Sequence, residues 1–267
     1  MDWDEMARPW LDAAPDLEAS FSEIFNILFT TAKLQPGEHV LDVGCGTGPT
    51  LLAASKAIGD TGTLTGIDIA PPLVARAAER VPDSVTLITG DAGTHPYDTA
   101  AFDAIIANFG IMFFADNAAA FQNLRQATKP GGRLVGNFWG TPPENPWFAM
   151  PRKIVDAHVA DVPRPDPAGP GPMRFGNPAS LEAILTDSGW SPRIETHDVL
   201  LTPPGPAEQV AALHMKVTVG MMLKGVEVDD DTLSAIKTDI IAASKDYQTK
   251  DGIRVPAKIH VVEATAA

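Results

Sequence analysis

Two kinds of apolar pattern alternate between residues 36 and 139. Short, nearly continuous apolar runs, typical of buried strands, are separated by stretches with apolar residues at helical spacing. The runs cover residues 40–42, 64–67, 85–88, 102–107 and 133–139. Strands that are apolar on both sides and are each followed by a helix favour a parallel sheet covered on both faces, with right-handed crossovers. The pattern therefore predicts an α/β fold with a doubly wound sheet.

Three further segments lie outside this core. Residues 1–35 consist of an arm, which contains Trp3 and Trp10, and a helix that follows it. The helix has one apolar stripe, formed by Leu17, Phe21, Ile24, Phe25 and Leu28. We expect the stripe to pack on the core and the tryptophans, which precede the helix, to pack or to fold over a ligand as a lid. Residues 140–178 are crowded with proline, which predicts a long irregular loop, functional or disordered. Residues 206–250 contain two helical patterns and predict a cap on the sheet.

A glycine-rich turn follows the first predicted strand. Residues 42–48 read Asp-Val-Gly-Cys-Gly-Thr-Gly, and Pro49 begins the next helix. Glycines at alternate positions allow positive φ and let a ligand touch the main chain. A dinucleotide fingerprint would place its last glycine where this chain has Pro49. The turn instead suits a ligand whose amino acid portion lies across the glycines, with Asp42 binding its ammonium group directly or through water.

Two more carboxylates end the second and third strands. Asp68 stands 20 residues after Gly48, where a carboxylate can accept hydrogen bonds from both hydroxyls of a ribose. Asp91 ends the third strand. In an open parallel sheet such positions meet in one crevice at the carboxyl ends of the strands. The ribose role of Asp68 would also suit NAD.

These motifs resemble those of the class I S-adenosylmethionine-dependent methyltransferases. Residues 102–110 are similar to the family's fourth-strand motif, and residues 129–134 are similar to the turn before its fifth strand. The resemblance implies a Rossmann-like sheet of seven strands in the order 3-2-1-4-5-7-6, with an antiparallel seventh strand at residues 254–264. With the helical cap, this makes residues 1–267 one methyltransferase domain whose cofactor-binding core is 36–139.

The resemblance also implies the cofactor S-adenosyl-L-methionine and a set of residues that bind it. Asp91 is expected to face the adenine amino group, and Asn108 and Phe109 to lie between cofactor and acceptor. The full expected set is Asp42, Gly44, Cys45, Gly46, Gly48, Asp68, Ile69, Asp91, Ala92, Asn108, Phe109 and Trp10. Within the family the chain resembles the small-molecule branch, which includes the ubiquinone and menaquinone methyltransferases and the natural-product methyltransferases with variable caps. Its acceptor is therefore expected to be a small molecule methylated on oxygen, nitrogen or carbon.

The motifs do not identify a catalytic residue. A sulfonium methyl group is already activated, so alignment of the acceptor can suffice. If a general base contributes, His95 and His214 are weak candidates. The single cysteine, Cys45, excludes a multi-thiolate metal site, and we expect it to fill space in the turn rather than to act as a nucleophile.

Composition narrows the partners. Acidic residues outnumber basic ones by 34 to 20, a net charge of −14, which disfavours binding to nucleic acid. The first residues do not resemble a secretory signal and no apolar run has the length of a membrane helix, so we expect a cytoplasmic protein without membrane partners. The sequence after the fourth strand, residues 108–111, reads Asn-Phe-Gly-Ile and departs from the Asn/Asp-Pro-Pro-aromatic motif of relatives that methylate protein or nucleobase amides.

Two other functions fit parts of the pattern. A non-catalytic S-adenosylmethionine-binding or regulatory protein would bind the cofactor without transferring its methyl group. A nicotinamide-dependent oxidoreductase would be stabilised by NAD and not by S-adenosylhomocysteine.

Overall fold

A computed structural model of the chain describes residues 3–166 and 168–267. Seven strands form one sheet in the order β3-β2-β1-β4-β5-β9-β6. The first five are parallel, and β9 runs antiparallel to both β5 and β6. Since β9 is the seventh strand of this sheet along the chain, the predicted order and direction are confirmed. The strands are β1 (His39–Val43), β2 (Thr63–Asp68), β3 (Thr86–Thr89), β4 (Phe102–Asn108), β5 (Thr128–Trp139), β6 (Trp190–Leu201) and β9 (Val255–Ala266).

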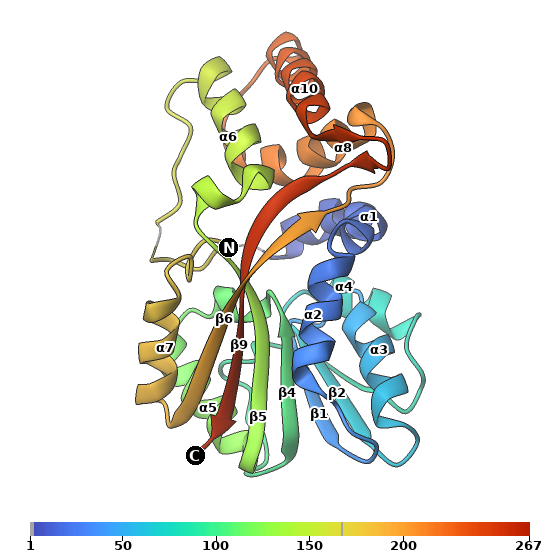
Figure 1. The fold of residues 1–267 in the computed structure, drawn as a ribbon, viewed down its shortest axis with the longest axis vertical. Coiled ribbons are helices and arrows are strands. Elements are labelled where there is room, and N and C mark those ends of the chain that lie inside the picture. The colour runs from blue at the N-terminus through green and yellow to red at the C-terminus, as the bar shows by residue number, and fades with distance from the viewer. Residues whose placement is uncertain (1–2, 167) are drawn as a thin grey trace.

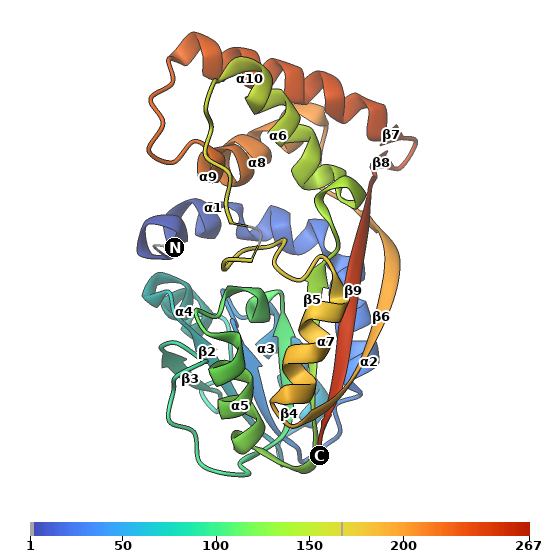
Figure 2. The same cartoon turned by 90° about the vertical axis from the view of Figure 1, so that its left-hand side faces the viewer.

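Helices cover both faces of this sheet, as the apolar strands require. Figure 1 and Figure 2 show α2 (Ser22–Ala32) and α3 (Pro49–Ile58) on one face, and α5 (Asn117–Ala127) and α7 (Pro178–Asp187) on the other. Helix α4 (Pro71–Ala78) packs against β2 and β3. The helices begin at residues suited to that place: the Asp116 side chain accepts a hydrogen bond from the Ala119 amide, and α3 and α7 each start with proline.

The N-terminal segment differs from its prediction. Helix α1 spans Trp3–Ser20, so Trp3 and Trp10 lie within a helix rather than before one. The side chain of Trp3 lies outside the described part of the structure. Small and apolar residues along α1 pack against α4, which explains why the helix extends so far despite two internal prolines. The chain turns at Phe21, with φ −103° and ψ 18°, and continues as α2.

The predicted cap is present and includes one helix that was not expected. Helix α6 (Pro146–His158) forms inside the proline-rich segment, so the expectation of an irregular loop is wrong for these residues. Pro146 lies in the first turn, where an amide donor has no helical partner, and the apolar residues Trp147, Pro151 and Val155 share the buried face. The stabilisation from this packing outweighs the cost of the internal Pro151.

Helix α6 packs with the two predicted cap helices. These are α8 (Ala207–His214), which continues through the π-helical turn η3 (Met215–Val219) into α9 (Gly220–Met222), and α10 (Asp230–Ser244). A small apolar core joins them, formed by Val155, Val162, Ala211, Val219, Ile236 and Ile240. Figure 2 shows α1 running between this cap and the sheet, while β6 and β9 extend up to the cap.

The remaining elements are short. They are the 3-10 turns η1 (Gly110–Phe113), η2 (Pro142–Glu144) and η4 (Lys245–Tyr247), and a hairpin of β7 (Gln248–Thr249) and β8 (Gly252–Ile253). The expected turn at residues 129–132 lies inside β5, where the register with β4 shifts. Across residues 3–166 and 168–267, no helix has both the length and the apolar character needed to cross a membrane.

Candidate functional site

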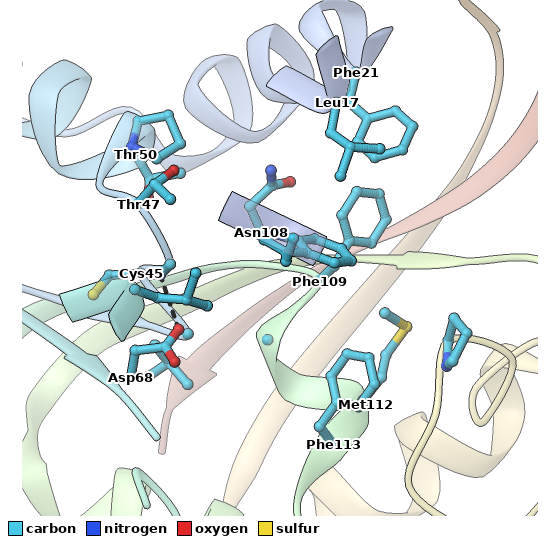
Figure 3. Close-up of a pocket in the computed structure, with 18 of the residues that line it drawn as sticks. Leu17, Phe21, Cys45, Thr47, Thr50, Asp68, Asn108, Phe109, Met112 and Phe113 are labelled. Atoms are coloured by element: carbon cyan, nitrogen blue, oxygen red, sulfur yellow. Dashed lines mark hydrogen bonds between the residues drawn. The ribbon is translucent and has the colours of Figure 1, made fainter. Parts of the chain in front are cut away.

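A cavity of about 590 Å³ opens at the carboxyl ends of the parallel strands. Helix α1 covers it. Its walls are formed by the turn after β1, by the ends of β2, β4 and β5, and by residues of α6, η3 and α9 in the cap. Figure 3 shows Asp68 and Thr47 on one side, Phe21 and Met112 on the other, and Asn108 between them. The cavity therefore has a polar side at the glycine turn and an aromatic side under the cap.

The three glycines of the turn have different tasks. All have positive φ. A Cβ on Gly44 would lie 2.9 Å from the Cα of Gly110, and one on Gly48 would lie 3.2 Å from a methyl group of Val81. A Cβ on Gly46 would meet no protein atom within 4 Å, and Gly46 lines the cavity. Gly44 and Gly48 thus permit close packing, whereas Gly46 leaves space for a ligand against the main chain.

The second-strand carboxylate is tied to this turn. One oxygen of Asp68 accepts a hydrogen bond from the Gly46 amide and the other from the Ala70 amide, each at 2.9 Å. Burial raises the pKa of Asp68 above its ordinary value, although these backbone hydrogen bonds oppose the shift. Each oxygen keeps a second lone pair. The geometry therefore leaves Asp68 able to accept from a diol at the cavity wall.

The other residues of the expected adenosine site also line the cavity. Asp91 has one oxygen bound to the Gly93 amide at 2.8 Å, which fixes the carboxylate at the end of β3. Ala92 lies beside it, and Ile69, a residue that is 47% exposed, follows Asp68. An exposed isoleucine on a cavity wall is a surface suited to a flat base.

Asp42 lies behind the wall. Its side chain is fully buried, and one oxygen accepts a hydrogen bond from the Thr50 hydroxyl. The other oxygen has no partner among the described residues. Burial raises the pKa of Asp42 to about 7. Neither Asp42 nor Gly48 is a lining residue, so the structure does not support direct contact between either and a ligand; binding by Asp42 through water stays a prediction.

Cys45 lines the cavity but is buried. It is 2% exposed, and burial raises the pKa of its thiol well above the usual range. The thiol therefore stays protonated, as expected for a residue that fills space.

Asn108 and Phe109 end β4 at the centre of the cavity. The Asn108 side-chain oxygen accepts a hydrogen bond from the Asn137 amide nitrogen at 3.0 Å. The Phe109 ring stacks on Trp139 with 4.4 Å between centroids and 6° between planes. Phe21 meets Trp139 edge-on at 5.4 Å, and Phe148 does so at 5.1 Å. We call the rings of Phe21, Phe109, Trp139, Trp147 and Phe148, all of which line the cavity, the aromatic chamber.

Helix α1 is fastened to the glycine turn by a charged side chain. Glu18 accepts from the Thr47 hydroxyl at 2.8 Å and from both terminal nitrogens of Arg80 at 2.7 and 2.9 Å. Burial alone would raise the pKa of Glu18, but the hydrogen bonds from Arg80 and Thr47 outweigh it and hold the pKa low. Glu18 and Trp10 both line the cavity, so α1 forms its roof.

Neither candidate histidine is placed to act as a base. The His95 ring packs edge-on against Tyr97 with centroids 4.8 Å apart and does not line the cavity. His214 lies behind Trp147 and contacts the Thr218 hydroxyl at 3.3 Å. Burial lowers the pKa of His214 to about 3, so its imidazole is neutral and weakly basic at physiological pH. Within the described residues, no group of three His, Cys, Asp or Glu side chains could hold a metal ion.

Sequence reasoning missed several wall residues. Trp139 was assigned only to a strand, Glu18 was not singled out, and Thr218 lay in a segment assigned to packing. Pro170 and Pro172, from the irregular part of the proline-rich segment, also line the cavity. The one available signal was Glu18, a carboxylate between the apolar positions Leu17 and Phe21 of the predicted stripe.

Comparison with known proteins agrees with this geometry. A family model described as a methyltransferase domain matches residues 40–132, which contain the glycine turn and both strand-end carboxylates. Residues 40–132 therefore match a methyltransferase domain, and the strand order around them is that of the class I S-adenosylmethionine-dependent methyltransferase fold. The cofactor is S-adenosylmethionine. The open face of Gly46 fits its methionine portion, the acceptor oxygens of Asp68 and Asp91 fit its ribose hydroxyls and adenine amino group, and the apolar Ile69 fits the flat base.

Three similar proteins illustrate how far the likeness reaches. Nocamycin O-methyltransferase from Saccharothrix syringae is 28% identical over 236 residues, 83% of this chain and 82% of the relative. Demethylmenaquinone methyltransferase from Shouchella clausii is 35% identical over 106 residues, and the match spans 38% of this chain and less than half, 45%, of the relative. The solved structure of Haemonchus contortus phosphoethanolamine N-methyltransferase 2 with S-adenosyl-L-methionine has a TM-score of 0.56 at 18% identity, covering 94% of this chain and 56% of that one. The last comparison shows a shared fold.

Proposed function

We propose that this chain transfers the methyl group of S-adenosylmethionine to a small, uncharged molecule by in-line displacement. One observation carries the proposal: a polar cradle at Gly46, Asp68 and Asp91 and the aromatic chamber are parts of a single cavity. Cofactor and acceptor can therefore lie next to each other under one roof, away from bulk water.

The polar cradle supplies the cofactor contacts. Asp68 accepts from the ribose hydroxyls, Asp91 accepts from the adenine amino group, and Ile69 and Ala92 lie against the base. The methionine portion lies across Gly44, Cys45 and Gly46. Trp10, on the roof, covers the cofactor from above, as the lid hypothesis predicts.

When bound, S-adenosylmethionine supplies an activated methyl group: a lone pair of the acceptor bonds to the methyl carbon, the methyl–sulfur pair stays on sulfur, and any proton on the acceptor atom passes to water. The chain contributes alignment. Asn108 and Phe109 stand at the junction of cradle and chamber, and the surrounding rings limit the access of water to one side of the acceptor. Holding two reactants in line can account for a large part of such a rate enhancement.

The nature of the walls supports catalysis without a base from the protein. His95 does not line the cavity, and His214 has a pKa near 3. The carboxylates of the cradle accept hydrogen bonds from backbone amides, and their remaining acceptor sites are the ones assigned above to the cofactor. A mechanism by proximity fits an acceptor that is already nucleophilic or that loses its proton readily to solvent.

Small-molecule acceptors are also what the relatives' names describe, namely nocamycin and demethylmenaquinone. We infer an acceptor of this general kind, without a nucleic acid or a membrane as partner. The expected location is the cytoplasm, where S-adenosylmethionine is available.

The cofactor assignment is tested by isothermal calorimetry with S-adenosylhomocysteine and, separately, NAD. We expect S-adenosylhomocysteine to bind and NAD not to bind. Asp68→Asn should weaken binding of S-adenosylhomocysteine at least tenfold, because hydrogen bonds to a charged group contribute about 1.5–3 kcal/mol. Asp98→Asn, an exposed carboxylate outside the cavity lining, is the matched control and should bind normally. Binding of NAD, or undiminished binding by Asp68→Asn, would contradict the assignment.

A non-catalytic role predicts a different outcome from the same protein. It would show tight S-adenosylhomocysteine binding but no methyl transfer to any member of a broad panel of small oxygen, nitrogen and carbon acceptors. Transfer of a labelled methyl group to at least one of them would show that the protein is a methyltransferase and exclude the non-catalytic role.

A further inference from the structure

The orientation of the Asn108 amide is fixed by its neighbours. The Asn137 side-chain nitrogen donates to the backbone carbonyl of Ile24 at 3.1 Å and to the Asn108 side-chain oxygen at 3.0 Å. A backbone carbonyl can only accept, so Asn137 must direct its NH₂ group toward Ile24. Its second hydrogen then reaches Asn108, which must present oxygen to it.

It follows that Asn108 directs its own NH₂ group away from Asn137. Asn108 lines the cavity, and among the described residues no hydrogen bond from its amide nitrogen is formed. Asn137 is fully buried and its own oxygen is left without a partner in the described structure. Such an arrangement costs free energy and holds Asn108 as a fixed hydrogen-bond donor at the end of β4.

The donor adjoins walls suited to flat rings. The stacked pair of Phe109 and Trp139 begins one residue further along the chain, and Trp147 and Phe148 complete the aromatic chamber. Aromatic groups bind such walls by stacking or edge-on contact. A flat molecule in the chamber would therefore bring one edge to the Asn108 amide.

Charge restricts the molecule further. Among the described residues that line the cavity there is no lysine, arginine or histidine, whereas Glu18, Asp68 and Asp91 are present. An anionic acceptor would find no cationic side chain on these walls, which makes the desolvation of its charge unfavourable. The walls instead suit an uncharged molecule.

Resting on the proposed function, we propose that the methyl acceptor is a flat, uncharged ring compound with a carbonyl oxygen beside the methylated atom, and that Asn108 binds this oxygen. The hydrogen bond would also draw electron density from the neighbouring hydroxyl or carbon acid. Its proton then leaves more readily to water, which accounts for a cavity without a well-placed histidine.

The experiment uses three probes on one ring system, in the presence of saturating S-adenosylhomocysteine. They are 2-acetyl-1-naphthol, 2-ethyl-1-naphthol, which lacks the carbonyl, and 1-hydroxy-2-naphthoate, which carries a negative charge. Binding is followed by quenching of tryptophan fluorescence, since Trp139 and Trp147 form part of the chamber. The wild type should bind the ketone about tenfold more tightly than either of the other two probes.

The variant Asn108→Asp tests the donor. A carboxylate still accepts from Asn137 but cannot donate, so the preference for the ketone over the ethyl compound should fall to less than twofold. Asn26→Asp is the matched control: it adds the same charge at another asparagine that lines the cavity, on α2. This control should keep the preference for the ketone.

The outcomes separate this inference from the proposed function. A wild type that binds the ketone no better than the ethyl compound, or binds the naphthoate best, overturns the inference, whether or not Asn108→Asp folds. So does an Asn108→Asp protein that keeps the preference. Failure of S-adenosylhomocysteine to bind the wild type would instead overturn the proposed function.

Discussion

Gly46→Ala separates ligand binding from folding stability at the glycine turn. The added Cβ would meet no protein atom within 4 Å, so the cost to the fold is limited to the positive φ of 53°. For a non-glycine residue this conformation costs about 1–2 kcal/mol. The variant should therefore fold with a modestly lower melting temperature.

Binding should change much more. The new methyl group would point into the space where the cofactor touches the main chain, and forcing an extra methyl group into a packed contact costs up to about 3 kcal/mol. This corresponds to a loss of roughly 100-fold in affinity. A ligand at 100 times its Kd adds about 2.7 kcal/mol to stability, and the same concentration adds only about 0.4 kcal/mol when the affinity is 100-fold lower.

The assay is thermal unfolding with and without S-adenosylhomocysteine. For a chain of this size the wild type should gain about 5–10 °C and Gly46→Ala about 1 °C. Gly131→Ala is the matched control, because Gly131 also has positive φ and open space at its Cβ but does not line the cavity. It should lose similar stability and keep the full ligand shift. If Gly46→Ala keeps the full shift too, the cofactor does not lie against this turn.

Three further predictions concern stability. Gly110→Ala should lower the free energy of unfolding by about 3 kcal/mol, because its Cβ would lie 2.3 Å from the Val43 carbonyl oxygen; an unchanged urea midpoint would contradict this. The pKa of Asp42 is about 7 in the folded chain against 3.8 for an ordinary aspartate. Between these values the folded chain holds a proton that the unfolded chain releases, so the free energy of unfolding should fall by up to about 4 kcal/mol as pH rises from 4 through 7. Asp42→Asn should lose this slope in urea titrations of the ligand-free protein; a persisting slope would assign it elsewhere. Glu18→Gln should weaken the pairing with Arg80 by about 1 kcal/mol and speed hydrogen exchange of α1 about fivefold, with α2 as internal control; equal rates would show that the pair does not hold α1.

The sequence predicts the sheet, and it predicts that the glycine turn and the strand-end carboxylates meet at one place, because the signals for both are local. Each buried strand is a continuous apolar run, and the glycine turn and the strand-end carboxylates directly follow such runs. The chirality and connection rules of parallel sheets then bring these ends together. The glycine turn, Asp68 and Asp91 accordingly line one cavity. The different tasks of Gly44, Gly46 and Gly48 could not be predicted, because they depend on which atoms of the folded chain lie next to each glycine.

The helical parts were harder to predict because packing decided them. Proline content argued against a helix at residues 146–158, yet one buried face there outweighs the lost backbone hydrogen bond. The same holds for α1, which tolerates Pro9 and Pro15 while lying between the cap and the sheet. Local propensity is a weak guide where an apolar face finds a partner elsewhere in the chain.

The aromatic chamber shows why the acceptor side of the site cannot be predicted from local sequence. Its rings come from the turn between α1 and α2 at Phe21, from the residue after β4 at Phe109, from the end of β5 at Trp139, and from α6 at Trp147 and Phe148. In the sequence each of these residues is an ordinary apolar position. Only the fold brings each ring centroid within 6.0 Å of at least one other, beside an amide oriented by a residue 29 positions away. The polar residues of the cavity each follow a single strand closely in the sequence, whereas the aromatic chamber depends on contacts between distant segments. Substitutions in the cap can change these contacts without touching Gly46, Asp68 or Asp91.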